Sequence, residues 1–304
     1  MSDIKSGAHN MYAERSKLQT DPHGTGKRPI LRVEHLCLDI LKGKNDIPIL
    51  QDISFDICEG ERWAIAGESG AGKSMTMNVM TSLFPQGSTR IRGRILFRQP
   101  DDTWQDLLEI PYRKRHSFVA RNVAVIFQDS INALNPNERI LKQYKDTVRL
   151  HSPSMSDMEI HEHILSRMDI FSIKGGEETL RHFPDQLSGG MRQRIAIAMA
   201  LESPARILIA DEPTTSLDAI TQRNTIDFIR DYLDHSGRTL LYISHDMGIL
   251  QYLCDYIMIL KNGRMVEQGT AKEVFYHGKA EYTKELVRET LKIMGKDENN
   301  ETSV

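Results

Sequence analysis

The chain has 304 residues, 27% of them charged and 39% hydrophobic, with a formal net charge of −3. This length allows one large domain or two small ones, and the near balance of charges argues against binding nucleic acid through a general electrostatic field. The three cysteines, Cys37, Cys58 and Cys254, form no CxxC pair. Neither a zinc knuckle nor a disulfide framework is therefore suggested, and a reducing, cytosolic compartment is the simplest interpretation.

The N-terminal residues 1–29 are polar, without periodicity and without the apolar segment of a secretory signal, which predicts a flexible tail. No stretch reaches the roughly 18 consecutive apolar residues that a membrane-spanning helix needs. Partly alternating strands are expected at 30–40 and 49–57, and a short buried strand at 63–66.

A glycine-rich motif follows this third strand and precedes a segment of helix-forming composition, residues 75–83. The motif matches G-x-x-x-x-G-K-[ST], a pattern whose backbone N–H groups surround phosphate oxygens at the start of a helix. We expect Lys73 to reach the β- and γ-phosphates of a nucleotide and Ser74 to bind Mg²⁺. A glycine-rich turn that happens to hold a lysine is the alternative, which this context disfavours. The members of the motif are Gly67, Glu68, Ser69, Gly70, Ala71, Gly72, Lys73 and Ser74.

The middle of the chain predicts a small helical insert at about 132–200, with helical spacing from 140 to 171 that is interrupted at Pro153. Before it come an expected turn region at 87–93, a short strand at 95–97 and a buried strand at 123–127. After it we expect strands at 206–210 and 239–243 and a helix at 221–233. A hairpin around Asn262-Gly263 and a helical segment at 270–294 complete the prediction. This division gives a main domain at 30–278 and a C-terminal helical extension with a polar tail at 279–304.

Four of the expected strands end in residues that suit a nucleotide site: the motif at Gly67, then Gln128, Asp211 with Glu212, and His245. In an open parallel sheet, ligands bind outside the carboxyl ends of the strands, so these residues should meet at one edge. Asp211 can hold Mg²⁺, and Glu212 can polarise an attacking water. The alternative for this acidic pair is capping a helix, since Pro213 and Thr214 follow it.

The remaining strand-end residues have weaker signals. Gln128 is expected to contact Mg²⁺ or the water, although a lone glutamine after a strand means little by itself. His245 is expected to bond the γ-phosphate, although a lone histidine is more often structural. A second anion-binding turn, Ser188-Gly189-Gly190, precedes a good helix. Ser188 is also a plausible helix cap. Because one triphosphate hardly needs two cradles, this turn is expected to serve a nucleotide held by another subunit.

With these motifs the sequence resembles the nucleotide-binding subunits of ABC transporters over residues 31–269. Residues 67–74 resemble Walker A, 207–212 Walker B with its catalytic glutamate, and 187–191 the family signature. Ser216-Leu217-Asp218 is similar to the D-loop. The resemblance implies a P-loop NTPase (ABC ATPase) of the α/β class, with an antiparallel β subdomain, a RecA-like parallel-sheet core and an inserted α-helical subdomain.

The resemblance also implies an ATP-hydrolysing motor that works as a head-to-tail dimer. Two ATP molecules with Mg²⁺ are sandwiched between the subunits, so that Ser188, Gly189, Gly190 and Asp218 act in trans. Closing on ATP and opening after hydrolysis then drive two transmembrane permease subunits. We therefore expect a peripheral protein at the cytoplasmic face of the cell membrane, without a nucleic-acid partner.

The segments 127–129, 134–136 and 282–286 are similar to those of ATPases from oligopeptide, dipeptide and nickel importers. This subfamily implies uptake of peptides or of metals and metal chelates, which an extracytoplasmic binding protein delivers. It also implies a second ATPase subunit, either a different paralogue or a second copy. No cysteine follows Cys254, so no iron–sulfur cluster is predicted, and Ile40-Leu41 stands where the family tends to stack adenine on an aromatic ring.

Three alternatives stay open at this point. The chain could serve another ABC subfamily, either an exporter or a different importer. It could be an ABC ATPase outside transport, although it lacks the long coiled-coil insert, zinc module or fused second cassette usual there. A non-hydrolysing regulatory subunit is disfavoured by Glu212, His245 and the intact signature.

Overall fold

An antiparallel four-stranded sheet forms one part of the computed structural model, which describes residues 22–43, 45–84, 87–128, 133–215 and 217–293. Its spatial order is β2-β1-β4-β5. The alternating apolar residues of β1 and β2 are buried on one face, as the sequence predicts. The strands are β1 (Pro29–Ile40), β2 (Ile47–Cys58), β4 (Thr89–Arg98) and β5 (Trp104–Asp106).

The turn predicted at 87–93 is wrong, because β4 already begins at Thr89, which pairs with Ile40. Gly87, Ser88 and Gly93 are residue types that are common in turns, which makes this stretch look like a loop. Arg90 and Arg92 instead alternate with partly buried residues on a solvated strand face, and each forms a 2.8 Å ion pair, with Asp46 and Asp39 respectively. A strand with one polar face thus begins well before its apolar part, 95–97.

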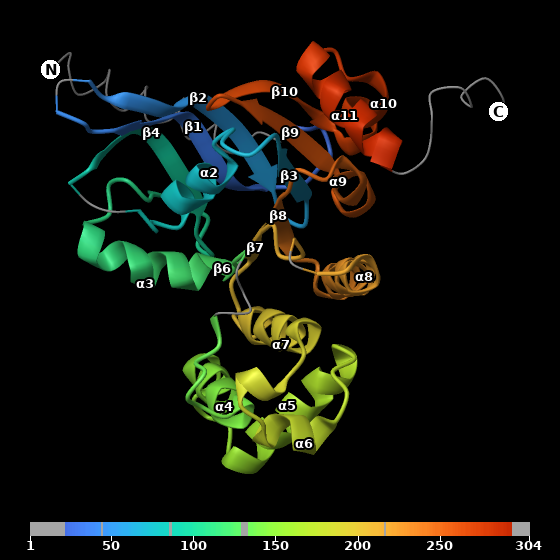
Figure 1. Cartoon of the computed structure of the whole chain (residues 1–304). Coiled ribbons are helices and arrows are strands. Elements are labelled where there is room, and N and C mark those ends of the chain that lie inside the picture. Colours follow the sequence, from blue (N-terminus) through green and yellow to red (C-terminus); the bar gives the residue numbers. More distant parts are fainter. Residues whose placement is uncertain (1–21, 44, 85–86, 129–132, 216, 294–304) are drawn as a thin grey trace, which may run out of the picture.

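A six-stranded sheet with the order β10-β9-β3-β8-β7-β6 forms the centre of the molecule (Figure 1). Five strands run parallel, and β10 returns antiparallel to β9 through the predicted Asn262-Gly263 turn. The parallel pairing of β9 with β3 adds a fifth strand to the four expected. The strands are β3 (Arg62–Ala66), β6 (Val123–Ile126), β7 (Ile207–Asp211), β8 (Thr239–Ile243), β9 (Tyr256–Lys261) and β10 (Arg264–Thr270).

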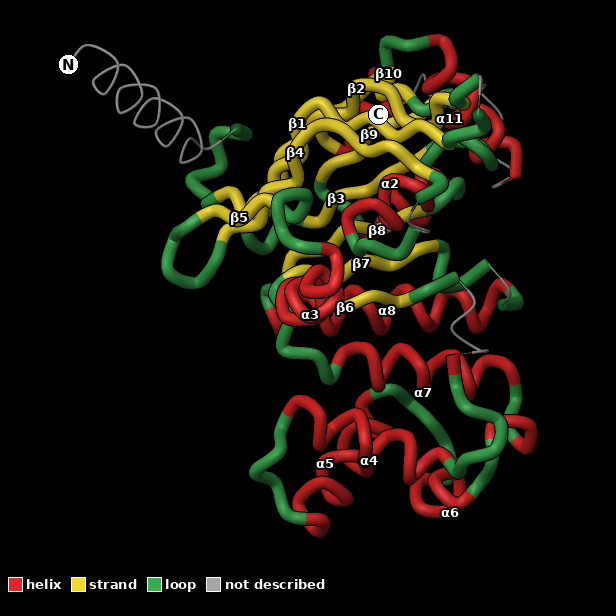
Figure 2. The backbone as a smooth tube through the Cα atoms, turned by 90° about the vertical axis from the view of Figure 1, so that its left-hand side faces the viewer, coloured by secondary structure: helices red, strands yellow, loops and turns green. Residues whose placement is uncertain are grey.

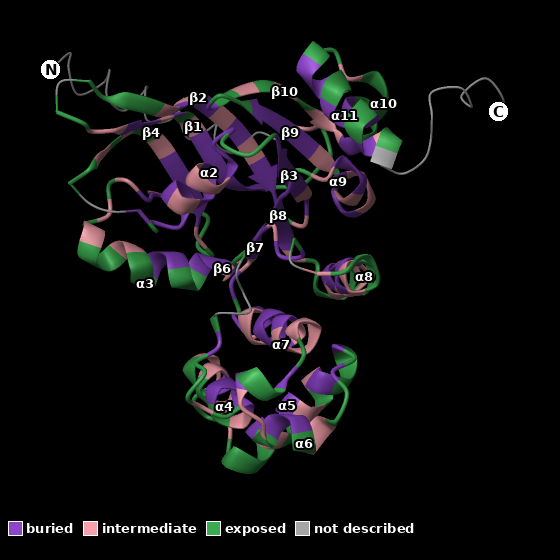
Figure 3. Cartoon of the chain, in the orientation of Figure 1, coloured by how far each residue is buried: buried purple, intermediate pink, exposed green. Residues whose placement is uncertain are grey.

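The five parallel strands of this sheet are buried on both faces, because their successive side chains point to opposite sides and both sets are covered (Figure 3). Ile65, Ile209 and Leu241 pack into one core with the antiparallel sheet. Leu208 and Tyr242 belong to the other core, which contains the helical insert and the C-terminal helices. The continuous apolar runs of the sequence are thus shared between two cores.

Helices α4 to α7 lie in the range predicted for the insert and form a separate lobe, in which α7 packs on β6 (Figures 1 and 2). The lobe's helices are α4 (Ile140–His151), α5 (Asp157–Ile170), α6 (Gly176–Arg181) and α7 (Gly189–Leu201). The other helices are α2 (Lys73–Met80), α3 (Tyr112–Asn122), α8 (Ala219–Ser236), α9 (Met247–Leu253), α10 (Ala271–His277) and α11 (Glu281–Ile293).

The segment predicted to be helical at 270–294 consists of two helices, α10 and α11. The carboxylate of Glu267 accepts the N–H groups of Lys279 (2.7 Å) and Ala280 (3.1 Å), which stabilises the break before α11. At the other end of the chain, the last part of the predicted tail contacts the core. The ring of His23 lies 5.3 Å from that of Trp63 and 4.9 Å from that of Tyr256.

Among the glycines in the described part of the chain, the hairpin residue Gly263 has the least room for a side chain. Its φ is 73°, and a Cβ there would lie 2.0 Å from the Ile49 carbonyl oxygen. Gly263→Ala should lower the free energy of unfolding by more than about 2 kcal/mol, since left-handed strain adds to a backbone clash. Gly237→Ala is the control: its φ is 62° with no atom within 4 Å of a Cβ, so it should cost only about 1 kcal/mol. If urea denaturation shows that both variants lose the same free energy of unfolding, the predicted clash at residue 263 is wrong.

Candidate functional site

The predicted phosphate loop is wedged between β9 and β2, and two of its glycines have no space for a side chain. A Cβ on Gly67 would lie 2.3 Å from the Leu260 carbonyl oxygen, and one on Gly72 would lie 2.8 Å from Leu50 Cδ2. Both residues also have positive φ, at 147° and 106°. The loop therefore needs glycine at these positions for both sterics and backbone conformation, and this close wrapping fits the binding of a phosphate group.

Lys73 begins α2 and is buried at the centre of this loop. Its Nζ donates hydrogen bonds to the carbonyl oxygens of Gly67 (2.8 Å) and Glu68 (3.0 Å). The same ammonium lies 3.7 Å from Glu212 Oε1. The lysine charge is thus held where the loop and the end of β7 meet.

Ser74 and Asp211 form a pair of oxygen ligands next to Lys73. The Ser74 hydroxyl donates to Asp211 Oδ1 at 3.2 Å. Burial raises the pKa of Asp211, and the Ser74 hydrogen bond partly opposes this. A hydroxyl and a carboxylate are hard oxygen ligands of the kind that Mg²⁺ prefers, so this pair fits the predicted magnesium site.

Glu212 follows β7 with a left-handed backbone, φ 42°, an uncommon conformation that often marks functional sites. Its N–H donates to the Ile243 carbonyl oxygen at 2.9 Å, which ties it to the end of β8. Its Oε1 lies 3.1 Å from His245 Nδ1, and its Oε2 accepts from the Thr215 hydroxyl at 3.1 Å. The helix-capping alternative for this acidic pair is wrong, because α8 begins at Ala219 with Asp218 as its cap.

The edge of the parallel sheet thus brings together most of the residues that the sequence singled out there. Lys73, Glu212 and His245 form one connected group, and Ser74 with Asp211 lies beside it. His245 is half-exposed at the end of β8. Gln128 is exposed beyond the end of β6, which pairs with β7, so the same edge continues to it.

The second anion-binding turn lies at the start of α7, in the helical lobe. Ser188 caps α7 by accepting the Met191 N–H at 3.3 Å, and a Cβ on Gly190 would lie 2.9 Å from Thr221 Cγ2. Asp218 caps the neighbouring α8, and its bonds from Thr221 lower its pKa. Among the described residues, no hydrogen bond or ion pair joins Ser188 or Asp218 to the phosphate loop.

Three contacts at the site were missed by sequence reasoning. Thr215 holds the Glu212 carboxylate, as described above. The Tyr282 hydroxyl of α11 accepts the Glu68 N–H at 3.0 Å, and the Gly263 N–H donates to the Ala71 carbonyl oxygen at 2.9 Å. The phosphate loop is therefore held by the β9–β10 hairpin and by a C-terminal helix. The Asn-Gly turn was visible in the sequence, but nothing there linked it or Tyr282 to the loop.

Comparison with known proteins settles the family. The profile of the family described as "ABC transporter" matches residues 50–215, more than half of the chain. The chain belongs to the ABC transporter family. It is thus an ABC ATPase, and the predicted P-loop NTPase fold with its antiparallel and parallel sheets is confirmed.

Several relatives of this ABC ATPase are named for import or peptide transport. The "Metal-staphylopine import system ATP-binding protein CntD" of Staphylococcus aureus (strain Mu50) is 34% identical over 264 residues, covering 87% of this chain and 94% of the relative. The "Dipeptide transport ATP-binding protein DppD" of Bacillus subtilis is 34% identical, covering 85% and 76%. The "Oligopeptide transport ATP-binding protein OppD" of the same species is 31% identical, covering 88% and 74%.

Solved structures share the fold of this ABC ATPase. CbiO1 from Clostridium perfringens, "part of the ABC transporter complex cbiONQ", superposes with a TM-score of 0.65 at 26% identity, covering 87% of this chain and 95% of the other. The ATP-binding cassette MJ0796 bound to ADP and Pi gives 0.67 at 24% identity, covering 80% and 99%. Within the described residues, no helix is long and apolar enough to cross a membrane.

Asp211 should reduce the stability of the nucleotide-free protein. Because burial raises its pKa, the charged form is disfavoured in the folded state, and this penalty is present above the raised pKa. Asp211→Asn should therefore raise the free energy of unfolding at neutral pH by about 0.5–2 kcal/mol. The gain should vanish as the pH falls below the usual aspartate value of about 3.9. Urea denaturation of both proteins across pH, without ATP or Mg²⁺, measures this. If the stability difference between Asp211→Asn and the wild type grows as the pH falls, burial of the charged Asp211 side chain does not cost stability.

Proposed function

We propose that this ABC ATPase powers an importer for peptides or metal chelates through separate transmembrane subunits. The names of its relatives support this substrate class, since they include dipeptide, oligopeptide and metal-staphylopine systems. The segments 127–129, 134–136 and 282–286 support the same subfamily. Uptake from outside the cell then requires an extracytoplasmic binding protein that delivers the substrate to the permease.

The main support for ATP hydrolysis at this site is the position of the Glu212 carboxylate. It lies 3.7 Å from the ammonium of Lys73 and 3.1 Å from His245 Nδ1. Lys73 and the backbone N–H groups of the loop would bind the β- and γ-phosphates of ATP. A water held at Glu212 Oε1 or Oε2 would attack the γ-phosphorus and give its proton to this carboxylate. The bond from that phosphorus to the β–γ bridging oxygen then breaks, and ADP and phosphate leave.

The other residues at the edge have supporting roles in this proposal. Ser74, Asp211 and Gln128 would hold Mg²⁺, which when bound neutralises charge on the phosphate oxygens. His245 would donate a hydrogen bond to the γ-phosphate. The contact from Thr215 keeps the Glu212 carboxylate aimed between Lys73 and His245. Residues Gly67 to Ser74 would together wrap the phosphates.

The proposal places two copies of the site at a subunit interface. In the described part of the chain, no hydrogen bond or ion pair joins Ser188, Gly189, Gly190 or Asp218 to this chain's own loop, which supports a role in trans on ATP held by a second ATPase subunit. That subunit is either a different paralogue or a second copy of this chain. The pair would lie at the cytoplasmic face of the membrane, peripheral to two transmembrane permease subunits. We propose no nucleic-acid partner and no iron–sulfur cluster.

Replacing the proposed base tests the chemistry. Glu212→Gln keeps the size of the side chain and one acceptor oxygen but removes the carboxylate that takes the proton, so the hydrolysis rate should fall by about 100-fold or more, while ATP binding persists. The assay is phosphate release by the chain with its membrane subunits in lipid. Glu289→Gln, an exposed acid on α11, is the matched control and should behave as wild type. Undiminished hydrolysis in Glu212→Gln would remove Glu212 from the mechanism.

The trans site is tested by Ser188→Arg, which adds bulk at the exposed start of α7. ATP binding by the single chain should be unchanged, because Ser188 does not contact the loop. ATP-dependent association with the second subunit, measured by light scattering in the Glu212→Gln background, should be lost. If Ser188→Arg still associates in this background, and the same substitution in the chain with Glu212 intact leaves ATP hydrolysis normal, the signature turn does not lie at the interface.

The substrate class is tested in the reconstituted complex. ATP hydrolysis should rise when a binding protein loaded with a peptide or a metal chelate is added, and the substrate should accumulate on the ATPase side. Substrate movement in the opposite direction would indicate an exporter and overturn the importer proposal while leaving the ATPase assignment intact.

A further inference from the structure

A second cluster of chemically active side chains lies at the turn between β2 and β3. His23, Cys58 and Glu61 each offer one metal-ligating atom, and these atoms lie within 4.8 Å of one another. Cys58 and Glu61 are fully buried, and the side chain of His23 is 16% exposed. We propose that this cluster binds one divalent transition-metal ion of the zinc type, separately from the nucleotide site.

The environment of the Glu61 carboxylate is the strongest argument that this cluster binds a cation. Its Oε2 accepts hydrogen bonds from the Cys58 N–H and the Trp63 indole N–H, both at 2.9 Å. Its Oε1 is buried and has no hydrogen-bond partner among the described residues. A buried carboxylate oxygen without a partner is costly, and a metal ion would satisfy it. The two donors on Oε2 also orient the carboxylate, as outer partners of metal ligands do.

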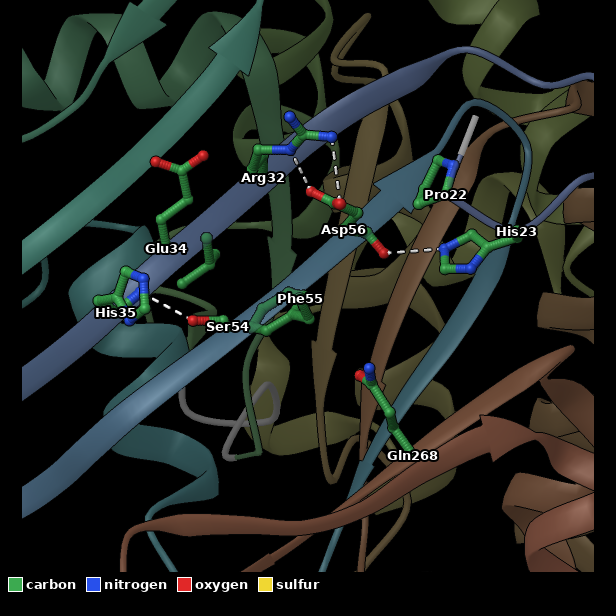
Figure 4. Close-up of a pocket in the computed structure, with 10 residues that line it drawn as sticks. Pro22, His23, Arg32, Glu34, His35, Ser54, Phe55, Asp56 and Gln268 are labelled. Atoms are coloured by element: carbon green, nitrogen blue, oxygen red, sulfur yellow. Dashed lines mark hydrogen bonds and ion pairs between the residues drawn. The ribbon is translucent and has the colours of Figure 1, made fainter. Parts of the chain in front are cut away.

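His23 brings the imidazole ligand to this carboxylate. Its ring packs on Trp63 and Tyr256, which are themselves stacked at 4.9 Å. Its Nε2 lies 3.3 Å from the Asp56 carbonyl oxygen (Figure 4). The same nitrogen lies 3.8 Å from Glu61 Oε2. The Glu61 carboxylate carries a negative charge, and the Asp56 carbonyl oxygen carries a partial negative charge. At 3.8 Å the histidine and carboxylate are too far apart for a direct hydrogen bond, and an ion between them would connect them.

A surface pocket reaches the cluster at His23, which is the cluster residue that lines it. The pocket has a volume of about 660 Å³, and His23 and Asp56 belong to its lining together with Arg32, His35 and Gln268 (Figure 4). His23 therefore lies at the boundary between this pocket and the buried Cys58 and Glu61. Water from the pocket can supply a fourth ligand, which completes the tetrahedral coordination usual for zinc.

The donor types select the metal. A thiolate, an imidazole and a carboxylate together favour Zn²⁺ over Mg²⁺ or Ca²⁺, which prefer oxygen ligands alone. Bond lengths of about 2.0–2.3 Å put tetrahedral ligand atoms roughly 3.5 Å apart, so the cluster must close by about 1 Å. Gly24, next to His23, would have no atom within 4 Å of an added Cβ beyond its chain neighbours, which leaves room for this shift. When the metal–sulfur bond forms, the Cys58 thiol releases its proton to solvent.

The test is a titration of the full chain, without a histidine tag and freed of metal with a chelator, in the absence of ATP. Zn²⁺ is added in competition with a chromophoric chelator. We expect one equivalent to bind the wild type, and His23→Ala and Cys58→Ser to bind at least about 100-fold more weakly. His35→Ala, from the same pocket, and Cys37→Ser are the matched controls and should keep wild-type affinity. Equal binding by all five proteins would overturn the proposal.

A second measurement needs no variant and therefore does not depend on whether Cys58→Ser folds. Co²⁺ added to the wild-type chain should give the near-ultraviolet charge-transfer absorption of a cobalt–thiolate bond, together with the visible bands of a tetrahedral site. Zn²⁺ should displace both sets of bands. Co²⁺ binding without thiolate absorption, or no binding of either metal, would show that Cys58 is a plain core residue and that the cluster is not a metal site.

Discussion

The close approach of the phosphate loop to its neighbours is the constraint on which the site depends. The loop can wrap a phosphate only if its backbone turns tightly, and it does so while pressed against the Leu260 carbonyl oxygen and the side chain of Leu50. Glycine at 67 and 72 avoids these clashes because it has no Cβ. β9 and β2, which supply those contacts, belong to different sheets. The site therefore forms only when both sheets are in place.

Around the loop, charge is balanced between elements that are distant in sequence. The Lys73 ammonium is shared by two loop carbonyl oxygens and lies near the Glu212 carboxylate. Glu212 in turn binds His245 and Thr215, so the ends of β3, β7 and β8 meet at one carboxylate. Its left-handed backbone and the burial of Asp211 both cost folding free energy. Stability is thus exchanged for a cluster of closely held charges, which the proposed function uses as the ATP site.

The sequence predicted which residues lie at the edge of the parallel sheet, because each buried strand is a short apolar run and the polar residue that follows it is adjacent in sequence. The rule that ligands bind at the carboxyl ends of parallel strands then joined Lys73, Asp211, Glu212 and His245. It missed the contacts of Tyr282 and Gly263 with the loop, because these depend on how distant elements pack. It also misjudged the start of β4, since Gly87, Ser88 and Gly93 give this stretch the composition of a turn. Individual hydrogen bonds, such as that from the Thr215 hydroxyl to Glu212, cannot be predicted from the order of residues in the sequence.

The docking of α11 has a consequence for any shortened form of the chain. Tyr282, Leu286 and Val287 are buried in the same core as the strand residue Ala64, and the Tyr282 hydroxyl accepts the Glu68 N–H. A protein truncated before this helix would expose the apolar surface beneath it and leave that loop amide to solvent. Removal of the C-terminal helix would therefore promote aggregation and loosen nucleotide binding at the same time, although no residue of α11 belongs to the nucleotide motifs.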